Sequence, residues 1–382
     1  MYFLLQKYPL ILQDLLHFPT VTSMTPRVGP PRSDGAPPPL HRRPIKHPAS
    51  PSTVNSTFFF ELSGESKDMP LAEVIRCLEA ETDGFELVSS GPGYAVASFD
   101  DRFLDPIADR IAMTHSIGRY LGEYTPDDVS GLADVELPEG TFAIRAKRFE
   151  GMMKDVDSQK LIRDAGALLS KHNDVNLKEP DVVVRMQMCD KVHMYIQQRV
   201  TDTDLLEKRK VGERPFFSPI SLHPKFARTL INLTGVKKGG TILDPFCGTG
   251  GVVIEAAAMG MKAIASDFDE EMVIGCQENM DFYGFKLEDF EVLDIGDIGE
   301  RFHDIDAVCT DPPYGRSTKT GGEPIDNIYR RAGEAIPKCL AEGGRAGVVL
   351  PHPISFDTMT LEGMYLQRVH GSLSRHYHIF RP

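Results

Sequence analysis

Few cysteines and no long apolar runs occur in this sequence, and each shortage excludes a class of protein. The six cysteines are spread over 382 residues without a Cys-x-x-Cys pair or a Cys/His cluster at zinc spacing, which argues against a disulfide framework or a metal site. No apolar run reaches the roughly 18 residues that a transmembrane helix needs. The apolar start 1–18 is interrupted by Lys7 and Asp14 and lacks a small-residue cleavage site. We therefore expect free thiols in the cytoplasm, no metal and no membrane contact.

Positive charge is scarce as well. The net charge of −13 argues against a nucleic-acid partner, because phosphate binding usually needs a basic face. The deficit is uneven, however: residues 54–140 carry 5 basic and 18 acidic side chains, whereas residues 141–210 carry 14 basic and 11 acidic ones. Among the segments expected to fold, only 141–210 has a net positive charge. An RNA-binding surface is therefore expected there.

Composition divides the first 220 residues into four segments. Residues 1–53 contain proline clusters that cannot bury a core, which predicts a disordered tail or a start codon assigned too early. Residues 54–115 predict a small α+β module of the ferredoxin-like kind, and residues 116–200 predict a second α+β module. Residues 201–220 are polar and bounded by proline, as is typical of a linker.

Residues 221–382 follow a different pattern, in which short apolar strands alternate with helices. This alternation predicts an α/β fold on a parallel, doubly wound sheet. The expected strands include 241–243, 263–265, 307–309 and 347–350, and the expected helices are 251–259, 270–283 and 325–340.

A glycine-rich loop follows the first of these strands. It lacks the Gly-x-Gly-x-x-Gly pattern of a dinucleotide fingerprint and the Lys-Ser/Thr ending of a triphosphate-binding loop, and an acid, Asp244, comes first. In open α/β sheets ligands bind beyond the carboxyl ends of the strands, and glycine lets a ligand approach the backbone. An acid here suits a cationic ligand such as the ammonium group of S-adenosylmethionine, although a plain strand–helix turn is the alternative. The expected cofactor residues are Asp244, Pro245, Phe246, Cys247, Gly248, Thr249 and Gly250.

Two further acids follow the next strands. Asp267 ends the second strand, where a carboxylate can accept hydrogen bonds from both ribose hydroxyls. Asp294 follows the third strand and could accept from an adenine amine while Phe268 and Ile295 sandwich the ring. Solvated acids at strand ends are the alternative for both positions, and Asp297 competes with Asp294.

The fourth strand leads into the motif Asp311-Pro312-Pro313-Tyr314. An exocyclic amine of guanine or adenine is a poor nucleophile, because its lone pair is delocalised into the ring. The Asp311 carboxylate and the Pro312 carbonyl could hold the two amine hydrogens and direct the lone pair at a methyl donor. The prolines fix the backbone, and Tyr314 offers a face on which an extruded base can stack. A chance match or a plain turn is the alternative.

Together these motifs resemble those of the S-adenosylmethionine-dependent tRNA guanine-N2-methyltransferases with an N-terminal THUMP domain, in particular the archaeal-type enzymes acting at guanosine 10. The resemblance covers about 55–382. It rests on Arg214-Pro215-Phe216-Phe217, Ser221 to Arg228, Asn232-Leu233-Thr234-Gly235, Leu243 to Gly250 and Asp311 to Gly315, and on Phe142 to Arg148 and Val175 to Asp181, which are similar to the two ends of a THUMP domain.

The resemblance implies a Rossmann-like class I methyltransferase domain with a seven-stranded, mostly parallel sheet, preceded by an α+β region containing a THUMP domain. It implies S-adenosylmethionine as cofactor, tRNA as partner, and one or two methyl additions to the guanine 2-amino group. His223 and Pro224 lie where the family's chain crosses the cofactor site. A monomer is expected, with an activating partner protein left open.

Phosphate contacts are expected on the net-positive segment, from Arg145, Lys147, Arg148 and Arg185. A solvated strand face is the alternative for these residues, and the loop 316–319 with Arg330 and Arg331 is the alternative RNA surface. The polar loop 316–323 is interpreted as a lid over the target base or as a solvated loop.

Two rival functions remain open from the sequence. The Asp-Pro-Pro-Tyr arrangement serves any exocyclic amine, so a DNA adenine-N6-methyltransferase or another RNA guanine-N2-methyltransferase is possible. A catalytically silent RNA-binding factor with a vestigial methyltransferase fold is the other rival.

Overall fold

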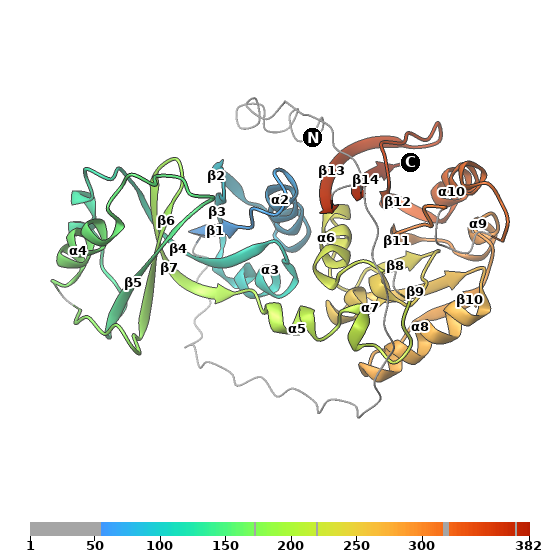
Figure 1. Ribbon diagram of the computed structural model, residues 1–382, viewed down its shortest axis with the longest axis horizontal. Coiled ribbons are helices and arrows are strands. Elements are labelled where there is room, and N and C mark those ends of the chain that lie inside the picture. Colours follow the sequence, from blue (N-terminus) through green and yellow to red (C-terminus); the bar gives the residue numbers. More distant parts are fainter. Residues whose placement is uncertain (1–54, 172, 219–220, 316–320, 371–372) are drawn as a thin grey trace.

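The computed structural model describes residues 55–171, 173–218, 221–315, 321–370 and 373–382. These residues form two lobes, each centred on a seven-stranded sheet (Figure 1). The expected tail 1–53 and most of the expected lid, 316–320, lie outside the described residues. Within the described ranges, no helix combines the length and the apolar character needed to cross a membrane.

The N-terminal lobe joins both α+β modules in one sheet, with the strand order β2-β3-β1-β4-β7-β6-β5. Its first part comprises β1 (Asn55–Leu62), α2 (Met69–Glu81), β2 (Glu86–Gly91), β3 (Tyr94–Asp100), α3 (Leu104–Arg110) and β4 (Thr114–Tyr124). Its second part comprises β5 (Phe142–Arg148), α4 (Ser158–Leu169), β6 (Val182–Met188) and β7 (Val192–Val200).

Strand β4 connects the two modules, and its sequence pattern had not indicated a strand. It pairs with β1 on one side and with β7 on the other. Two glycines, Gly118 and Gly122, weaken its strand pattern, yet Gly118 is required: a Cβ there would lie 1.9 Å from the Ile196 carbonyl oxygen. The expected boundary at 115/116 therefore falls within a strand that belongs to both modules.

The C-terminal lobe has the predicted α/β fold. Its sheet has the order β10-β9-β8-β11-β12-β14-β13, in which β10 to β12 run parallel and β14 is antiparallel to its neighbours. The strands are β8 (Thr241–Asp244), β9 (Lys262–Asp267), β10 (Asp289–Val292), β11 (Ile305–Thr310), β12 (Leu340–Leu350), β13 (Thr360–His370) and β14 (Leu373–Arg381). The helices are α6 (Pro224–Thr234), α7 (Gly251–Ala258), α8 (Glu270–Phe282), α9 (Ile298–Arg301) and α10 (Ile325–Cys339).

Parallel pairing brings the carboxyl ends of β8, β9, β10 and β11 to one edge of the sheet. The acids expected from the sequence follow those strand ends, so the topology gathers them there. The fold class predicted from strand–helix alternation is confirmed. The prediction succeeded because strands that are apolar on both faces need helices on both faces of the sheet.

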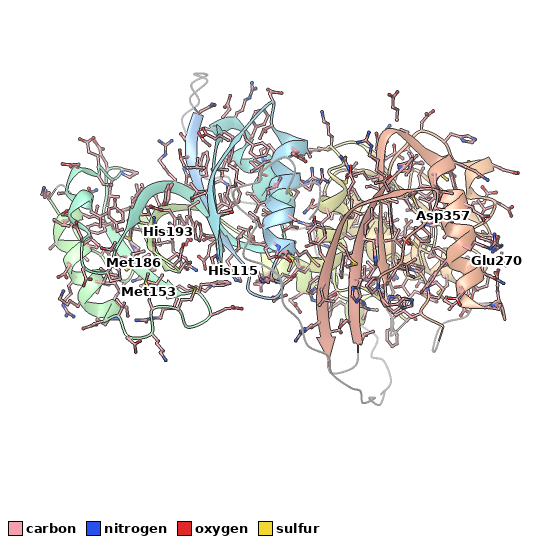
Figure 2. All side chains as sticks on the ribbon, turned by 90° about the horizontal axis from the view of Figure 1, so that it is seen from above. His115, Met153, Met186, His193, Glu270 and Asp357 are labelled. Atoms are coloured by element: carbon pink, nitrogen blue, oxygen red, sulfur yellow. The ribbon has the colours of Figure 1, made fainter. Side chains whose placement is uncertain are left out.

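Helix α6 lies between the two lobes (Figure 1). Its Asn232 is fully buried, donates to Glu73 of α2 at 2.8 Å and accepts from Arg110 of α3 at 2.9 Å. Figure 2 shows the labelled His115 in the N-terminal lobe on the side that faces the C-terminal lobe. The lobes are thus joined by buried polar bonds, which fix their relative placement.

The segment expected to be a linker is folded and packs on the C-terminal lobe. It contains α5 (Thr203–Glu207) and a 3-10 turn at Val211–Glu213. Arg209 donates to the buried Glu255 of α7 at 2.6 and 2.9 Å. This bidentate ion pair anchors the segment beside the glycine-rich loop.

Candidate cofactor and substrate site

Asp244 lies at the centre of the carboxyl edge of the sheet. The side chain is 2% exposed, and its Oδ1 accepts from the Thr310 hydroxyl at 2.6 Å and from the Phe246 amide at 3.2 Å. Burial raises the pKa of Asp244 to about 7, although these two hydrogen bonds oppose the rise. A cationic ligand would favour the ionised form, so this acid is suited to hold an ammonium group.

The glycine-rich loop follows Asp244 in the chain and is hydrogen-bonded to Asp267. Gly248 and Gly250 have φ angles of 49° and 83°, which favour glycine, and a Cβ on Gly250 would lie 2.8 Å from the Cys276 Sγ. The Gly248 amide donates to Asp267 Oδ2 at 3.1 Å. Asp267 thus stabilises the loop and still lies at the end of β9, where it can accept from a ribose.

Cys247 and Thr249 contribute backbone to this loop, while their side chains point into the protein. Cys247 belongs to the buried core, beside Cys276. The neighbouring Cys276 thiol and burial raise the pKa of Cys247, which favours the neutral thiol over the nucleophilic thiolate.

A cavity of about 220 Å³ with a mostly apolar lining opens beside the loop. The expected cofactor residues Pro245, Phe246, Phe268, Asp294 and Ile295 line it, together with Leu293, Pro313, Gly321, Glu323, Ile328 and Arg331. Its position between the ends of β8, β9 and β10 suits a flat adenine ring.

Asp294 reaches this cavity but is already engaged. Arg331 of α10 donates to both carboxylate oxygens, at 2.6 and 2.7 Å, and also lies 3.3 Å from Glu323. The sequence had suggested Arg331 only as an alternative RNA contact. Its bidentate pair with Asp294 instead places it at the rim of the expected adenine site.

The Asp-Pro-Pro-Tyr motif begins directly after β11. Tyr314 donates its hydroxyl hydrogen to Asp311 Oδ1, and Tyr329 of α10 donates to the Pro313 carbonyl at 2.8 Å. Burial raises the pKa of Asp311, and the charge of Arg375 on β14 opposes this, with its Nη2 4.0 Å from Asp311 Oδ2. The backbone of Pro312 and Pro313 is therefore fixed between the acid and the cofactor cavity.

Arg214 is a site residue to which the sequence assigned no role. It is 5% exposed; Nε donates to the Arg209 carbonyl at 3.0 Å, and Nη1 bonds to the Ser221 and Thr249 hydroxyls at 3.3 and 3.2 Å. Among the described residues, Nη2 has no hydrogen-bond partner. The guanidinium lies against the start of α7, since a Cβ on Gly251, the first residue of that helix, would lie 3.5 Å from Nη1.

A buried guanidinium with a free donor beside a helix N-terminus suits an anion. The methionyl part of the cofactor carries both an ammonium and a carboxylate group. Asp244 can hold the former and Arg214 the latter. Only the Arg-Pro-Phe-Phe motif itself could have indicated this arginine in advance.

His223 and Pro224 serve the start of α6. The His223 Nδ1 accepts from the Lys225 amide at 3.2 Å, and Nε2 lies 3.0 Å from Glu207 Oε1. Pro224 is buried at the first position of the helix, which proline favours. These contacts make His223 the cap of α6, and its place at the cofactor site stays a prediction.

The four basic residues expected to bind RNA all make contacts within the N-terminal lobe. Lys147 and Arg185 pair with Glu61 of β1 at 2.6 and 3.0 Å, and Glu61 is only 1% exposed. Arg148 donates to the Met153 and Val156 carbonyls. Arg145 donates to the carbonyl of Leu177.

These contacts bring together residues from both α+β modules. Burial raises the pKa of Glu61, but the bonds from Lys147, Arg185 and Tyr195 together lower it to about 2. Lys147 nevertheless keeps 43% of its side chain exposed, so it can still reach a phosphate.

In the parts of the chain that the structure describes, no cluster of His, Cys, Asp and Glu side chains could hold a metal ion.

Comparisons with known proteins identify both parts of the chain. A family model described as RMKL-like, methyltransferase domain matches residues 211–375, and a THUMP domain model matches residues 132–197. The crystal structure of TrmN from Thermus thermophilus superposes with a TM-score of 0.50 at 19% identity, over 85% of this chain and all of that one. This likeness supports the fold.

Curated relatives match most of the chain. The tRNA (guanine(10)-N2)-dimethyltransferase of Methanothermobacter thermautotrophicus is 34% identical over 82% of this chain and 96% of its own. The enzyme of the same name from Pyrococcus abyssi is 35% identical over 72% of this chain and 85% of its own. The protein therefore belongs to the family of tRNA guanine-N2-methyltransferases that join a THUMP domain to an S-adenosylmethionine-dependent methyltransferase domain, as the sequence resemblance implied.

Proposed function

We propose that this protein methylates the 2-amino group of guanosine 10 in tRNA and adds one or two methyl groups. The observation that carries this proposal is the position of Asp311, Pro312 and Tyr314 at the end of β11, next to the cofactor cavity. The names of the relatives, which specify guanosine 10, support the choice of base and position.

The residues of the site suit a direct displacement at the methyl carbon. S-adenosylmethionine, when bound, supplies an electrophilic methyl group. Asp244 holds the ammonium and Asp267 accepts from the ribose, while the apolar residues of the cavity exclude water from the ring. Asp311 accepts one hydrogen of the guanine amine and receives its proton as the nitrogen is methylated.

Tyr314 requires a change of contact before it can stack on the base. Its hydroxyl is bonded to Asp311 Oδ1, the group that the amine of the base needs. In the proposed step an incoming guanine replaces this hydroxyl at the carboxylate, which releases the ring of Tyr314 to lie against the base.

The N-terminal lobe is proposed to hold the tRNA. Its THUMP domain overlaps β5, β6 and β7, which carry Arg145, Lys147, Arg148 and Arg185. Recognition through phosphate contacts would read the shape of the tRNA more than its sequence.

We further propose that the protein is a cytoplasmic monomer. The six cysteines are free and buried, which fits a reducing compartment. Light scattering after size exclusion, with and without tRNA, tests the oligomeric state.

The proposed reaction is tested with unmodified tRNA transcripts and S-adenosylmethionine carrying a labelled methyl group. Label should enter a transcript with guanosine at position 10 and not one with adenosine there, and nucleoside analysis should give N2-methylguanosine or its dimethyl form. Methylation of duplex DNA at adenine would favour the rival enzyme. Cofactor binding without transfer to any nucleic acid would favour the silent RNA-binding factor.

A further inference from the structure

Arg375 is a buried arginine that reaches the substrate acid from the last strand of the chain. It lies on β14, next to β12 in the sheet (Figure 1), and is 8% exposed. Its Nη2 lies 4.0 Å from Asp311 Oδ2, and its guanidinium interacts with the Tyr314 hydroxyl. Arg375 thus reaches Asp311 and Tyr314 although it lies about 60 positions later in the sequence.

The bonding of Arg375 differs from that of an arginine buried for stability. Arg110, 3% exposed, donates to Asn232, to the Val236 carbonyl and to Glu81. Arg375, by contrast, leaves Nε without a partner among the described residues, and its distance to Asp311 is too long for a hydrogen bond. Burying a charge with incomplete hydrogen bonding is costly. Arg375 therefore adds little to the free energy of unfolding.

The groups that face Asp311 are otherwise neutral or acidic. They are Tyr314, Tyr329 of α10, Tyr377 of β14 and Asp244 of β8. Among the described residues, Arg375 is the cation that acts on Asp311. Without it, a carboxylate in this apolar and partly acidic place would favour its protonated form, which cannot accept the amine hydrogen in the same way.

We propose that Arg375 is a positioning residue for methyl transfer, which holds Asp311 as an ionised acceptor turned toward the amine of the target base. This proposal rests on the proposed function of Asp311. It assigns a role in the chemistry to the antiparallel end of the sheet, whose other described group facing Asp311, Tyr377, is uncharged.

Three substitutions of Arg375 separate charge from packing. Arg375→Gln and Arg375→Met remove the charge, and methionine keeps apolar volume if glutamine fails to fold. Arg375→Lys keeps the charge. Arg381→Gln is the matched control, because Arg381 lies on the same strand, is half exposed and pairs only at 3.8 Å with Glu362.

The rate of one turnover is measured with enzyme in excess over tRNA, as a function of pH, together with cofactor affinity by calorimetry. The two neutral variants should lose about ten- to hundredfold in rate, with cofactor affinity within about twofold of wild type. In the pH–rate profile of these two variants, the fall in rate on the acid side should move to higher pH by about one unit or more. Arg375→Lys should recover most of the rate, and Arg381→Gln should match wild type.

Several results would overturn the proposal. They are a wild-type rate in either neutral variant, a fall in rate on the acid side that does not move, or equal losses in Arg375→Lys and Arg375→Met. A wild-type enzyme that methylates a different guanosine would refute only the proposed tRNA position, and the variants would then be compared on that substrate. A wild-type protein that binds cofactor but methylates no acceptor would overturn both proposals.

Discussion

The Thr310 hydroxyl donates to Asp244 Oδ1 at 2.6 Å, and this bond joins the ends of β11 and β8. Thr310 is directly followed by Asp311, so the acid assigned to the cofactor and the acid assigned to the base are connected by one buried hydrogen bond. The two ligands must therefore meet at a fixed spacing, which is what direct methyl transfer requires.

Asp311→Ala should remove the acceptor while leaving the cofactor site intact. We expect the rate of methyl transfer to fall by hundreds-fold or so, because one preorganised electrostatic group is lost at the reacting nitrogen. Single-turnover assays measure this rate, and calorimetry should show nearly unchanged cofactor affinity. Activity within a few-fold of wild type would refute the role of Asp311.

Asp267→Ala should act on the cofactor. Loss of an acceptor for the ribose hydroxyls costs about 1–3 kcal/mol, so the Kd for S-adenosylmethionine should rise roughly ten- to hundredfold with tRNA affinity intact. The matched control is Asp269→Ala, since Asp269 caps α8 by accepting from the Glu271 amide. The control should lose some stability and no cofactor affinity; equal losses in both variants would mean that another acid holds the ribose.

Arg214→Gln should weaken the grip on the cofactor carboxylate. A charge-assisted hydrogen bond contributes about 1.5–3 kcal/mol, so the Kd for S-adenosylmethionine should rise about tenfold or more. Decarboxylated S-adenosylmethionine provides the control ligand, because it lacks the group that Arg214 is expected to hold. Wild type and Arg214→Gln should bind it equally, whereas a loss of affinity for both ligands would indicate general damage to the loop.

Cofactor binding should depend on pH through Asp244. Its pKa of about 7 means that most of the carboxyl is protonated at pH 5.5, and only the ionised form pairs with the ammonium. Calorimetry should therefore show affinity rising roughly tenfold from pH 5.5 to pH 7. Asp244→Asn should bind weakly and without this dependence, and a wild-type affinity that is flat over the range would contradict the assignment.

The same acid should affect the stability of the cofactor-free protein. Its pKa is higher in the folded than in the unfolded chain, so its stabilising contribution is complete below about pH 4 and is lost as the pH rises through about 7. The free energy of unfolding should decline over that range relative to Asp244→Asn. Denaturant titrations at several pH values measure the difference.

The basic residues of the N-terminal lobe make a separate prediction about tRNA. If Lys147 and Arg148 contact phosphates, Lys147→Gln with Arg148→Gln should weaken all tRNAs about equally and reduce the salt dependence of affinity by close to one slope unit per lost contact. Filter binding over a salt series measures both quantities. Lys160→Gln is the control, because Lys160 is exposed on α4.

The contacts of Lys147 require one further check. Its pair with Glu61 means that the substitution also leaves a buried acid less well compensated, so stability must be measured alongside binding. An unchanged salt slope with reduced stability would assign these residues to the fold and place the RNA surface elsewhere.

The sequence alone determined the C-terminal fold and the order of its chemistry. Short apolar strands alternating with helices specify a parallel sheet. Asp244 and Asp267 end their strands, and Asp311 directly follows one. Because parallel strands present their carboxyl ends on one edge, such local patterns were sufficient to predict one site. The family resemblance depended on the same contiguous motifs.

Tertiary structure decided which distant residues complete that site. Arg214 contacts the glycine-rich loop, Arg331 pairs with Asp294, and Arg375 lies near Asp311. The three arginines come from different elements, and no local sequence spacing encodes such contacts. Likewise Glu61 of the first module binds Lys147 and Arg185 of the second, across a sheet that glycine-containing β4 makes continuous. Long side chains on twisted strands find partners only after the sheet has formed, and the energy of each pair depends on burial, which the packed chain alone sets.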